Sequence, residues 1–186
     1  MKELSKDTEY ALLFNTAAAS GASGTARTLK GFDGWVTTNV ETGSATADEA
    51  LTEDMFNDAL ETVWAAGGYP QTAICGAFQK RKVSGFTTNT RYMVADENKL
   101  ASAVDVYQSD FGTVQIRLHH QIQKTASDKV FIFGEMSHWV KAWLRPVKKE
   151  RQPYAGDGEL WTIRTELTLE SRQELGHGKI TQLATS

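Results

Sequence analysis

Cysteine and proline are scarce in this sequence, which has 186 residues, one cysteine (Cys75) and three prolines. A single cysteine cannot form a disulfide within the chain or supply the four sulfur ligands of a structural zinc site. The sequence also lacks an apolar run of the roughly 18 residues that a membrane-spanning helix needs, and it opens without a signal-peptide pattern. We therefore expect a soluble chain of intracellular origin, with no membrane association, that is stabilised by a hydrophobic core.

Neither sign of charge is in large excess, since 20 basic and 23 acidic side chains give a net charge of −3. This balance argues against a protein that binds nucleic acid through its overall charge. Two local basic clusters are present, at residues 79–82 (Gln-Lys-Arg-Lys) and 148–151 (Lys-Lys-Glu-Arg). We expect a solvated face or salt bridges to a neighbouring subunit. The alternative is a nucleic-acid-binding module that uses these clusters with aromatic side chains, although most tryptophans and tyrosines occupy positions typical of a core.

The most regular helical pattern covers residues 51–66. Thr52 can accept an amide hydrogen bond as N-cap, and a Gly-Gly pair followed by Pro70 ends the pattern. We expect Trp64 to be buried where this helix packs on a sheet. Six side chains recur at helical spacing and predict the buried face: Met55, Phe56, Ala59, Leu60, Val63 and Trp64.

Strand patterns dominate the second half of the chain. From about Val104, apolar and polar residues alternate on both sides of a turn, which predicts a half-buried antiparallel pair. An aromatic-rich segment that begins at Trp139 ends at Pro146. Helices are also expected at residues 3–15 and around the first basic cluster. Further strands are expected at residues 34–40, 72–75, 129–134, 161–169 and close to the C-terminus. These elements predict a mixed α+β fold.

The tripeptide Asp110-Phe111-Gly112 has the sequence that binds magnesium in protein kinases. A kinase also needs a glycine-rich phosphate loop, a strand lysine paired with a helical glutamate, and an Asp/Asn catalytic loop before this tripeptide. The sequence contains none of these, and the tripeptide lies between two alternating strands where Asp and Gly favour a tight turn. We predict a structural turn with Gly112 in a conformation that a β-branched residue resists, against the alternative of a nucleotide-binding enzyme that uses Asp110.

No other pattern in the sequence supplies a complete catalytic or metal-binding set. His119 and His120 are adjacent, so on a strand they point to opposite faces and cannot bind one metal ion. The other two histidines, His138 and His177, lie in different elements. Residues 176–179 (Gly-His-Gly-Lys) lack the upstream glycine and the following Ser/Thr of a phosphate loop, so we expect a turn. We predict no catalytic, cofactor-binding or metal-binding residues, and no cofactor.

Several segments, taken in order, resemble those of one known family. These are ARTLKGFDGWVTTN (residues 26–39), LTEDMFNDALETVWAAGGYP (51–70), VDVYQSDFGTVQI (104–116), WLRPV (143–147) and TELTLESRQELGHGKITQL (165–183). They are similar to the Arg-x-x-x-Gly loop, the Trp-Ala-x-Gly-Gly helix, the Asp-Phe-Gly hairpin and the closing strands of tailed-bacteriophage major capsid proteins. The resemblance is to the SU-ten-like subgroup, which has the Hong Kong 97-type shell fold.

This resemblance implies a fold with a peripheral lobe, built on a spine helix and long strands, and an axial lobe that points to the centre of a hexamer or pentamer. It assigns residues 1–48 to the peripheral lobe, 49–150 mainly to the axial lobe, and 151–186 to closing strands that return to the peripheral lobe. It implies a structural subunit, not an enzyme, that self-assembles into an icosahedral phage or prophage capsid around the genome.

The implied partners are copies of the same chain, with a portal, a scaffold or a maturation protease and non-specific contact with packaged DNA. The implied location is the virion, after synthesis in the bacterial host cytoplasm. Family members carry about a hundred more N-terminal residues, including an arm and a hairpin loop that clasp neighbouring subunits. From their apparent lack here we expect a chain that folds but forms monomers or small open oligomers instead of closed shells.

Overall fold

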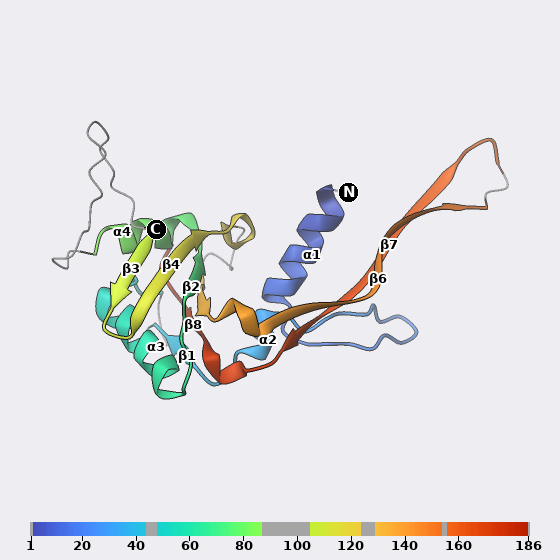
Figure 1. Cartoon of the computed structure of the whole chain (residues 1–186). Coiled ribbons are helices and arrows are strands. Elements are labelled where there is room, and N and C mark those ends of the chain that lie inside the picture. The colour runs from blue at the N-terminus through green and yellow to red at the C-terminus, as the bar shows by residue number, and fades with distance from the viewer. Residues whose placement is uncertain (1, 44–47, 87–104, 124–128, 154–155, 186) are drawn as a thin grey trace. The chain divides into compact units, whose positions relative to one another are not determined.

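The computed structural model describes residues 2–43, 48–86, 105–123, 129–153 and 156–185 (Figure 1). The chain forms two compact units. Unit 1 consists of Met1–Trp35 and Ser137–Arg172, and unit 2 of Val36–Met136 and Gln173–Ser186. The division into lobes near residues 48 and 150, which the family resemblance implies, stays a prediction. No helix in the described ranges is long and apolar enough to cross a membrane.

Unit 2 is built on a six-stranded mixed sheet with the order β1-β8-β5-β2-β4-β3. The β1–β8 and β2–β4 pairs are parallel, and the other neighbours are antiparallel. The predicted start of the alternating strand at Val104 lies outside the described residues. The strands are β1 (Val40–Thr42), β2 (Thr72–Cys75), β3 (Val106–Ser109), β4 (Gly112–Leu118), β5 (Phe131–Gly134) and β8 (His177–Thr181).

Helix α3 (Glu53–Ala65) supplies most of the helical side of the unit 2 core. The amide of Met55 donates to the Thr52 hydroxyl over 3.2 Å, which confirms the predicted N-cap. Gly67 has a φ of +85°, so the predicted glycine stop is also confirmed. The ring of Phe56 packs edge-on against those of Tyr107 and Phe131, at centroid distances of 5.2 Å. The apolar stripe of α3 therefore fixes this helix on the sheet.

The predicted burial of Trp64 is wrong, because this side chain is 50% exposed. Val63, the preceding residue, is fully buried and points into the core. Successive residues of a helix are rotated by about 100°, so Trp64 points away from the centre of the buried face. Its ring lies 5.9 Å from that of Phe111 at the edge of the sheet. Trp64 is therefore a surface aromatic and not a core anchor.

Other elements of unit 2 follow the sequence pattern. The predicted strand at residues 129–134 is confirmed by β5, whose four residues are all buried, so that this strand is covered on both faces. Helix α4 (Ala77–Ser84) carries the first basic cluster. The predicted turn at residues 176–179 is only partly correct. Gly176 ends a short 3-10 helix, η4 (Glu174–Gly176), while His177 already begins the buried strand β8. Two further 3-10 helices are η1 (His120–Gln123) and η3 (Met136–His138).

Unit 1 contains α1 (Lys2–Phe14), a one-turn helix α2 (Phe32–Trp35) and a long antiparallel ribbon of β6 (Trp139–Gln152) and β7 (Leu160–Ser171). The predicted strand at residues 34–40 is wrong in its first part. The amide of Trp35 donates to the carbonyl of Gly31 over 3.1 Å, which is a helical hydrogen bond, and the strand begins only at Val40.

Strand β6 does not end at Pro146 as expected. The strand continues to Gln152, and the register against β7 shifts between Trp143 and Arg145 and again between Arg145 and Lys148. Proline has no amide to donate to a ladder, so strands accept it at bulges. The register shifts on both sides of Pro146 therefore allow β6 to continue through a residue that would otherwise end the strand.

Candidate assembly surfaces

The Asp110-Phe111-Gly112 tripeptide forms the tight corner between β3 and β4. The Ser109 hydroxyl accepts from the amide of Phe111 over 3.2 Å and donates to the carbonyl of Gly112 over 3.1 Å. Gly112 has a φ of +132°, which confirms its predicted conformation. Asp110 is exposed at the turn, and Phe111 packs on Trp64. The local chain is organised as a turn, without converging groups that would hold a nucleotide phosphate.

The histidines do not converge. His119 lies just after β4 and His120 begins η1, while His138 and His177 belong to η3 and β8. Within the ranges that the structure describes, no group of three His, Cys, Asp or Glu side chains could hold a metal ion. Cys75 is fully buried in β2. Among the described residues, the features that could bind other chains are therefore surfaces.

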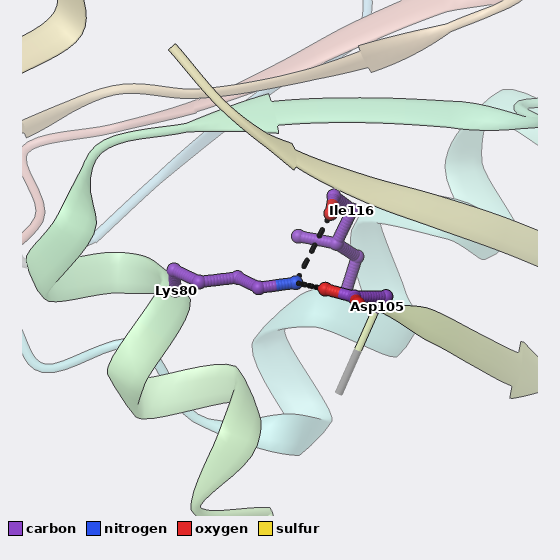
Figure 2. A network of polar contacts seen from close by, with 3 residues as sticks. All are labelled: Lys80, Asp105 and Ile116. Carbon is purple, nitrogen blue, oxygen red and sulfur yellow. Dashed lines mark hydrogen bonds and ion pairs between the residues drawn. The ribbon is translucent and has the colours of Figure 1, made fainter. Parts of the chain in front are cut away.

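The first basic cluster is only partly solvated, because Arg81 alone of its four residues is exposed. Gln79 and Lys80 are buried, and the ammonium group of Lys80 reaches from α4 to the edge of the sheet (Figure 2). There it donates to the Asp105 carboxylate and to the carbonyl of Ile116, both over 3.0 Å. Lys82 of the same cluster stacks over the ring of Phe78. These contacts use the cluster to fasten α4 to the β3–β4 pair, and they leave less positive charge for an external partner.

The second basic cluster lies on β6, and its charges are partly paired within the ribbon. Lys148 contacts Glu150 over 2.9 Å, and this hydrogen bond holds the pKa of Glu150 below its ordinary value. Arg151 contacts Glu159 over 3.0 Å, and Lys149 stacks over the ring of Trp161. These ion pairs are formed within one chain, so the expected salt bridges to a neighbouring subunit stay a prediction.

One side of the β6–β7 ribbon combines apolar and basic side chains, and we call it the aromatic face. Directly opposed residues in an antiparallel pair share a face. The opposed pairs on this face are Lys141 with Leu169, Trp143 with Leu167, Lys149 with Ile163 and Arg151 with Trp161. The other face carries mainly polar and charged pairs, such as Lys148 with Arg164 and Arg145 with Glu166. A ribbon with two such different faces is suited to packing its apolar face against another element.

The aromatic face is exposed in the chain as the structure describes it. Trp143, Trp161 and Ile163 are 45%, 46% and 37% exposed. Leu144 and Val147, next to the bulges, are 77% and 42% exposed. Contiguous exposed apolar surface of a few hundred Å² commonly marks a site of protein interaction. The sequence pattern predicted that most tryptophans lie in the core. The Lys-x-Trp and Lys-x-Arg alternation on β6 could have indicated that their face is exposed, because it puts cations on the same face.

A second surface lies in unit 2, beside the β3–β4 corner. Tyr69, Phe111 and Thr113 line a groove of about 400 Å³ together with neighbouring residues of β2 and β4. Tyr69 is 62% exposed, and Trp64 lies next to Phe111. The groove is shallow and has no buried charged group among its lining residues, which suits a protein contact better than a catalytic site.

Several solved structures of phage, encapsulin and capsid proteins have a similar arrangement of elements. The chain matches the structure titled Gordonia phage Cozz with a TM-score of 0.59 at 13% identity, over 98% of this chain and 60% of that one. It matches the SrpI encapsulin of Synechococcus elongatus with a TM-score of 0.59 at 10% identity, covering 98% and 62%. It matches the capsid of a GTA particle with a TM-score of 0.56 at 9% identity, covering 98% and 63%. The chain thus spans less than two thirds of the length of these structures.

The fold is therefore that of the Hong Kong 97-type capsid and encapsulin shells, which confirms the predicted fold class. No curated protein sequence matches the chain. The model of one sequence family, the SU10 major capsid protein, matches residues 1–184. The chain belongs to this family of bacteriophage capsid proteins, so it is a structural protein and not an enzyme.

Proposed function

We propose that the chain is a shell subunit that assembles with copies of itself into the hexamers and pentamers of an icosahedral phage capsid, which encloses the genome. The observation that carries this proposal is the match of the capsid family over residues 1–184. The exposed aromatic face of the ribbon supports it, because a shell subunit needs broad surfaces for other copies.

Each unit corresponds to one lobe in this proposal. Unit 1 supplies the peripheral lobe, because it contains a helix and the long strands β6 and β7. Unit 2 supplies the axial lobe, with the six-stranded sheet and helices α3 and α4. The closing strands are then divided between the lobes, with β7 in the peripheral lobe and β8 in the axial lobe.

The proposed location is the virion, after synthesis in the cytoplasm of the bacterial host. A portal, a scaffold and a maturation protease are the further partners that a phage capsid of this kind would need. Contact with packaged DNA would be non-specific, since Lys80, Lys148 and Arg151 already have acceptors within the chain.

Sedimentation velocity over a concentration series, followed by electron microscopy, tests the proposed function. Because the chain spans less than two thirds of the solved shell proteins it resembles, we expect monomers at low concentration that associate reversibly into small open oligomers at high concentration. A chain that stays monomeric up to millimolar concentration, with and without a crowding agent, would contradict the proposal. Binding of an oligonucleotide with a steep salt dependence, in the absence of self-association, would favour the nucleic-acid-binding alternative.

A further inference from the structure

The β6–β7 ribbon should gain stability when its aromatic face packs against another element. An isolated two-stranded ribbon is at best marginally stable in water, and it gains stability when one face packs on another element. The end of the ribbon nearest the turn carries Lys149 and Arg151 opposite Ile163 and Trp161, and all four side chains are exposed. Nothing in the described part of the chain covers this end of the aromatic face.

Helix α1 is the second element of unit 1 whose side chains are not buried by the described residues. None of its 13 residues is buried, and a helix of this length is marginal in water without tertiary packing. It contacts α2 at its C-terminal end, where the amide of Gly31 donates to the carbonyl of Asn15 over 2.7 Å. In Figure 1 the part of the ribbon near its turn lies apart from α1. The two elements therefore do not cover each other within one chain.

One side of α1 carries what we call the acidic stripe: Glu3, Asp7, Tyr10 and Phe14. Their spacing of four, three and four residues places them on one side of the helix. Glu3, Asp7 and Tyr10 are exposed, and the rings of Tyr10 and Phe14 contact each other with centroids 5.2 Å apart. This stripe has two carboxylates followed by two aromatic rings, which is complementary to a surface of cations and aromatic rings.

We propose that the acidic stripe of α1 of one copy binds the aromatic face of the β6–β7 ribbon of a second copy. This inference rests on the proposed function, since it requires that the chain associates with itself. Glu3 and Asp7 are separated by about 6 Å along the helix axis. Lys149 and Arg151 are separated by about 6.6 Å along the strand. Two carboxylates can therefore meet two cations at the same time, while Tyr10 lies toward the tryptophan and isoleucine side chains.

The present partners of these charges are exchangeable. Lys6 contacts Glu3 over 3.2 Å, and Arg151 contacts Glu159 over 3.0 Å, with both members of each pair largely exposed. Such surface pairs contribute little to stability, so replacing them at an interface costs little. The contact uses different surfaces on the two copies, so each chain retains one free helix and one free ribbon. Contacts of this type propagate into rings or shells instead of closing as a dimer.

Charge-reversed variants of the full chain test the pairing by sedimentation equilibrium. The ribbon variant carries Lys149→Glu and Arg151→Glu, and the helix variant carries Glu3→Lys and Asp7→Lys. We expect each variant alone to associate at least about tenfold more weakly than the wild type, because like charges then face each other. An equimolar mixture of the two variants should regain association, because the reversed ribbon meets the reversed helix.

The control variant carries Lys148→Glu and Arg164→Glu, which make the same change in charge on the opposite face of the ribbon. It should associate like the wild type, and circular dichroism should show that every variant is folded.

Wild-type association that neither reversal weakens would overturn this inference but leave the proposed function standing. Weakened association that mixing does not restore would also overturn it, because the ribbon would then bind an element other than α1. A wild type that stays monomeric would contradict both. Quenching of tryptophan fluorescence by an oligonucleotide, lost in the ribbon variant, would identify nucleic acid as the occupant instead.

Discussion

Phe56 and Trp64 lie on the same helix but differ in what surrounds them. Phe56 is fully buried next to four other aromatic rings, whereas Trp64 is half-exposed and contacts Phe111. We expect Phe56→Ala to lower the free energy of unfolding by about 3–5 kcal/mol. Trp64→Ala should cost only about 1 kcal/mol, the contribution of a single exposed aromatic pair. Denaturant unfolding of both variants measures the difference, and equal losses would place Trp64 in the core after all.

Gly112 allows the corner between β3 and β4. Its φ of +132° is accessible to glycine but strained for any residue with a Cβ, although no atom would touch that Cβ within 4 Å. We therefore expect Gly112→Val to lower the free energy of unfolding by about 1–3 kcal/mol through backbone strain alone. Thr113→Val, at the next position of β4, where the side chain is exposed, is the control and should change stability by less than about 0.5 kcal/mol. A thermal melt of each variant tests the comparison.

Glu174 connects η4 to the segment before β1. Burial works to raise the pKa of its carboxyl group, but the amides of Thr37 and Thr38 and the Thr38 hydroxyl donate to it and together hold the pKa below its ordinary value. A lowered pKa in the folded state stabilises the protein above the ordinary glutamate pKa of about 4.3, and this contribution is lost as the pH falls through the folded value.

Glu174→Gln should therefore be less stable than the wild type by about 1–2 kcal/mol at pH 7, and the difference should shrink below about pH 4. Urea unfolding at a series of pH values measures this convergence. The matched control is Glu61→Gln on the exposed side of α3, which should unfold with nearly wild-type stability at pH 7. A gap between wild type and Glu174→Gln that stays constant down to pH 3 would show that the carboxylate charge is not what holds the Thr37–Thr38 amides.

The cation of Lys80 helps to fasten helix α4 to the sheet. The chain of Lys80 is buried, and its ammonium group bonds Asp105 at the start of β3 and the carbonyl of Ile116 in β4 (Figure 2). Lys80→Met keeps the length of the side chain but removes both hydrogen bonds. We expect a loss of about 1–3 kcal/mol, whereas Lys82→Met on the same helix should cost less than about 0.5 kcal/mol. Similar unfolding midpoints for the two variants would mean that packing, not the ammonium group, holds α4.

Elements with a strong local signal could be predicted from the sequence. Thr52, the apolar stripe and the glycine stop of α3 are local features, and so is the alternation that defines β4 and β7. The pairing of β1 with β8 brings Val40 opposite Lys179 and depends on residues far apart in the chain, which no local pattern encodes. The continuation of β6 through Pro146 depends on bulges that only the partner strand reveals.

The candidate surfaces were harder to predict than the elements. Trp143 and Trp161 alternate with charged residues in the same way as core residues of a half-buried strand, so periodicity identifies their common face but not whether that face is covered. Lys80 was part of a run of charged residues that is typical of a solvated surface, and only its position against β3 and β4 made burial possible. The family resemblance carried the functional prediction because it draws on several segments at once.

At the scale of the whole molecule, stability is distributed unevenly between the two units. All members of the main hydrophobic core, including Phe56, Phe131 and Ile180, belong to unit 2. In unit 1, α1 has no buried residue, and most side chains of β6 from Trp143 to Lys149 are exposed on both faces of the ribbon. Segments with few buried apolar contacts open locally at low free-energy cost.

Hydrogen–deuterium exchange of the unassembled chain should therefore show slow exchange in β2, β5 and α3, and much faster exchange in α1 and the β6–β7 ribbon. The same measurement on assembled material should show added protection in α1 and the ribbon, because association supplies the cover that each lacks within one chain, while unit 2 changes little. The control for crowding is the monomer with bovine serum albumin added to the same total protein concentration. If α1 and the ribbon were already protected as strongly as β5 in the monomer, their stability would come from within the chain, and assembly would need no contribution from either element.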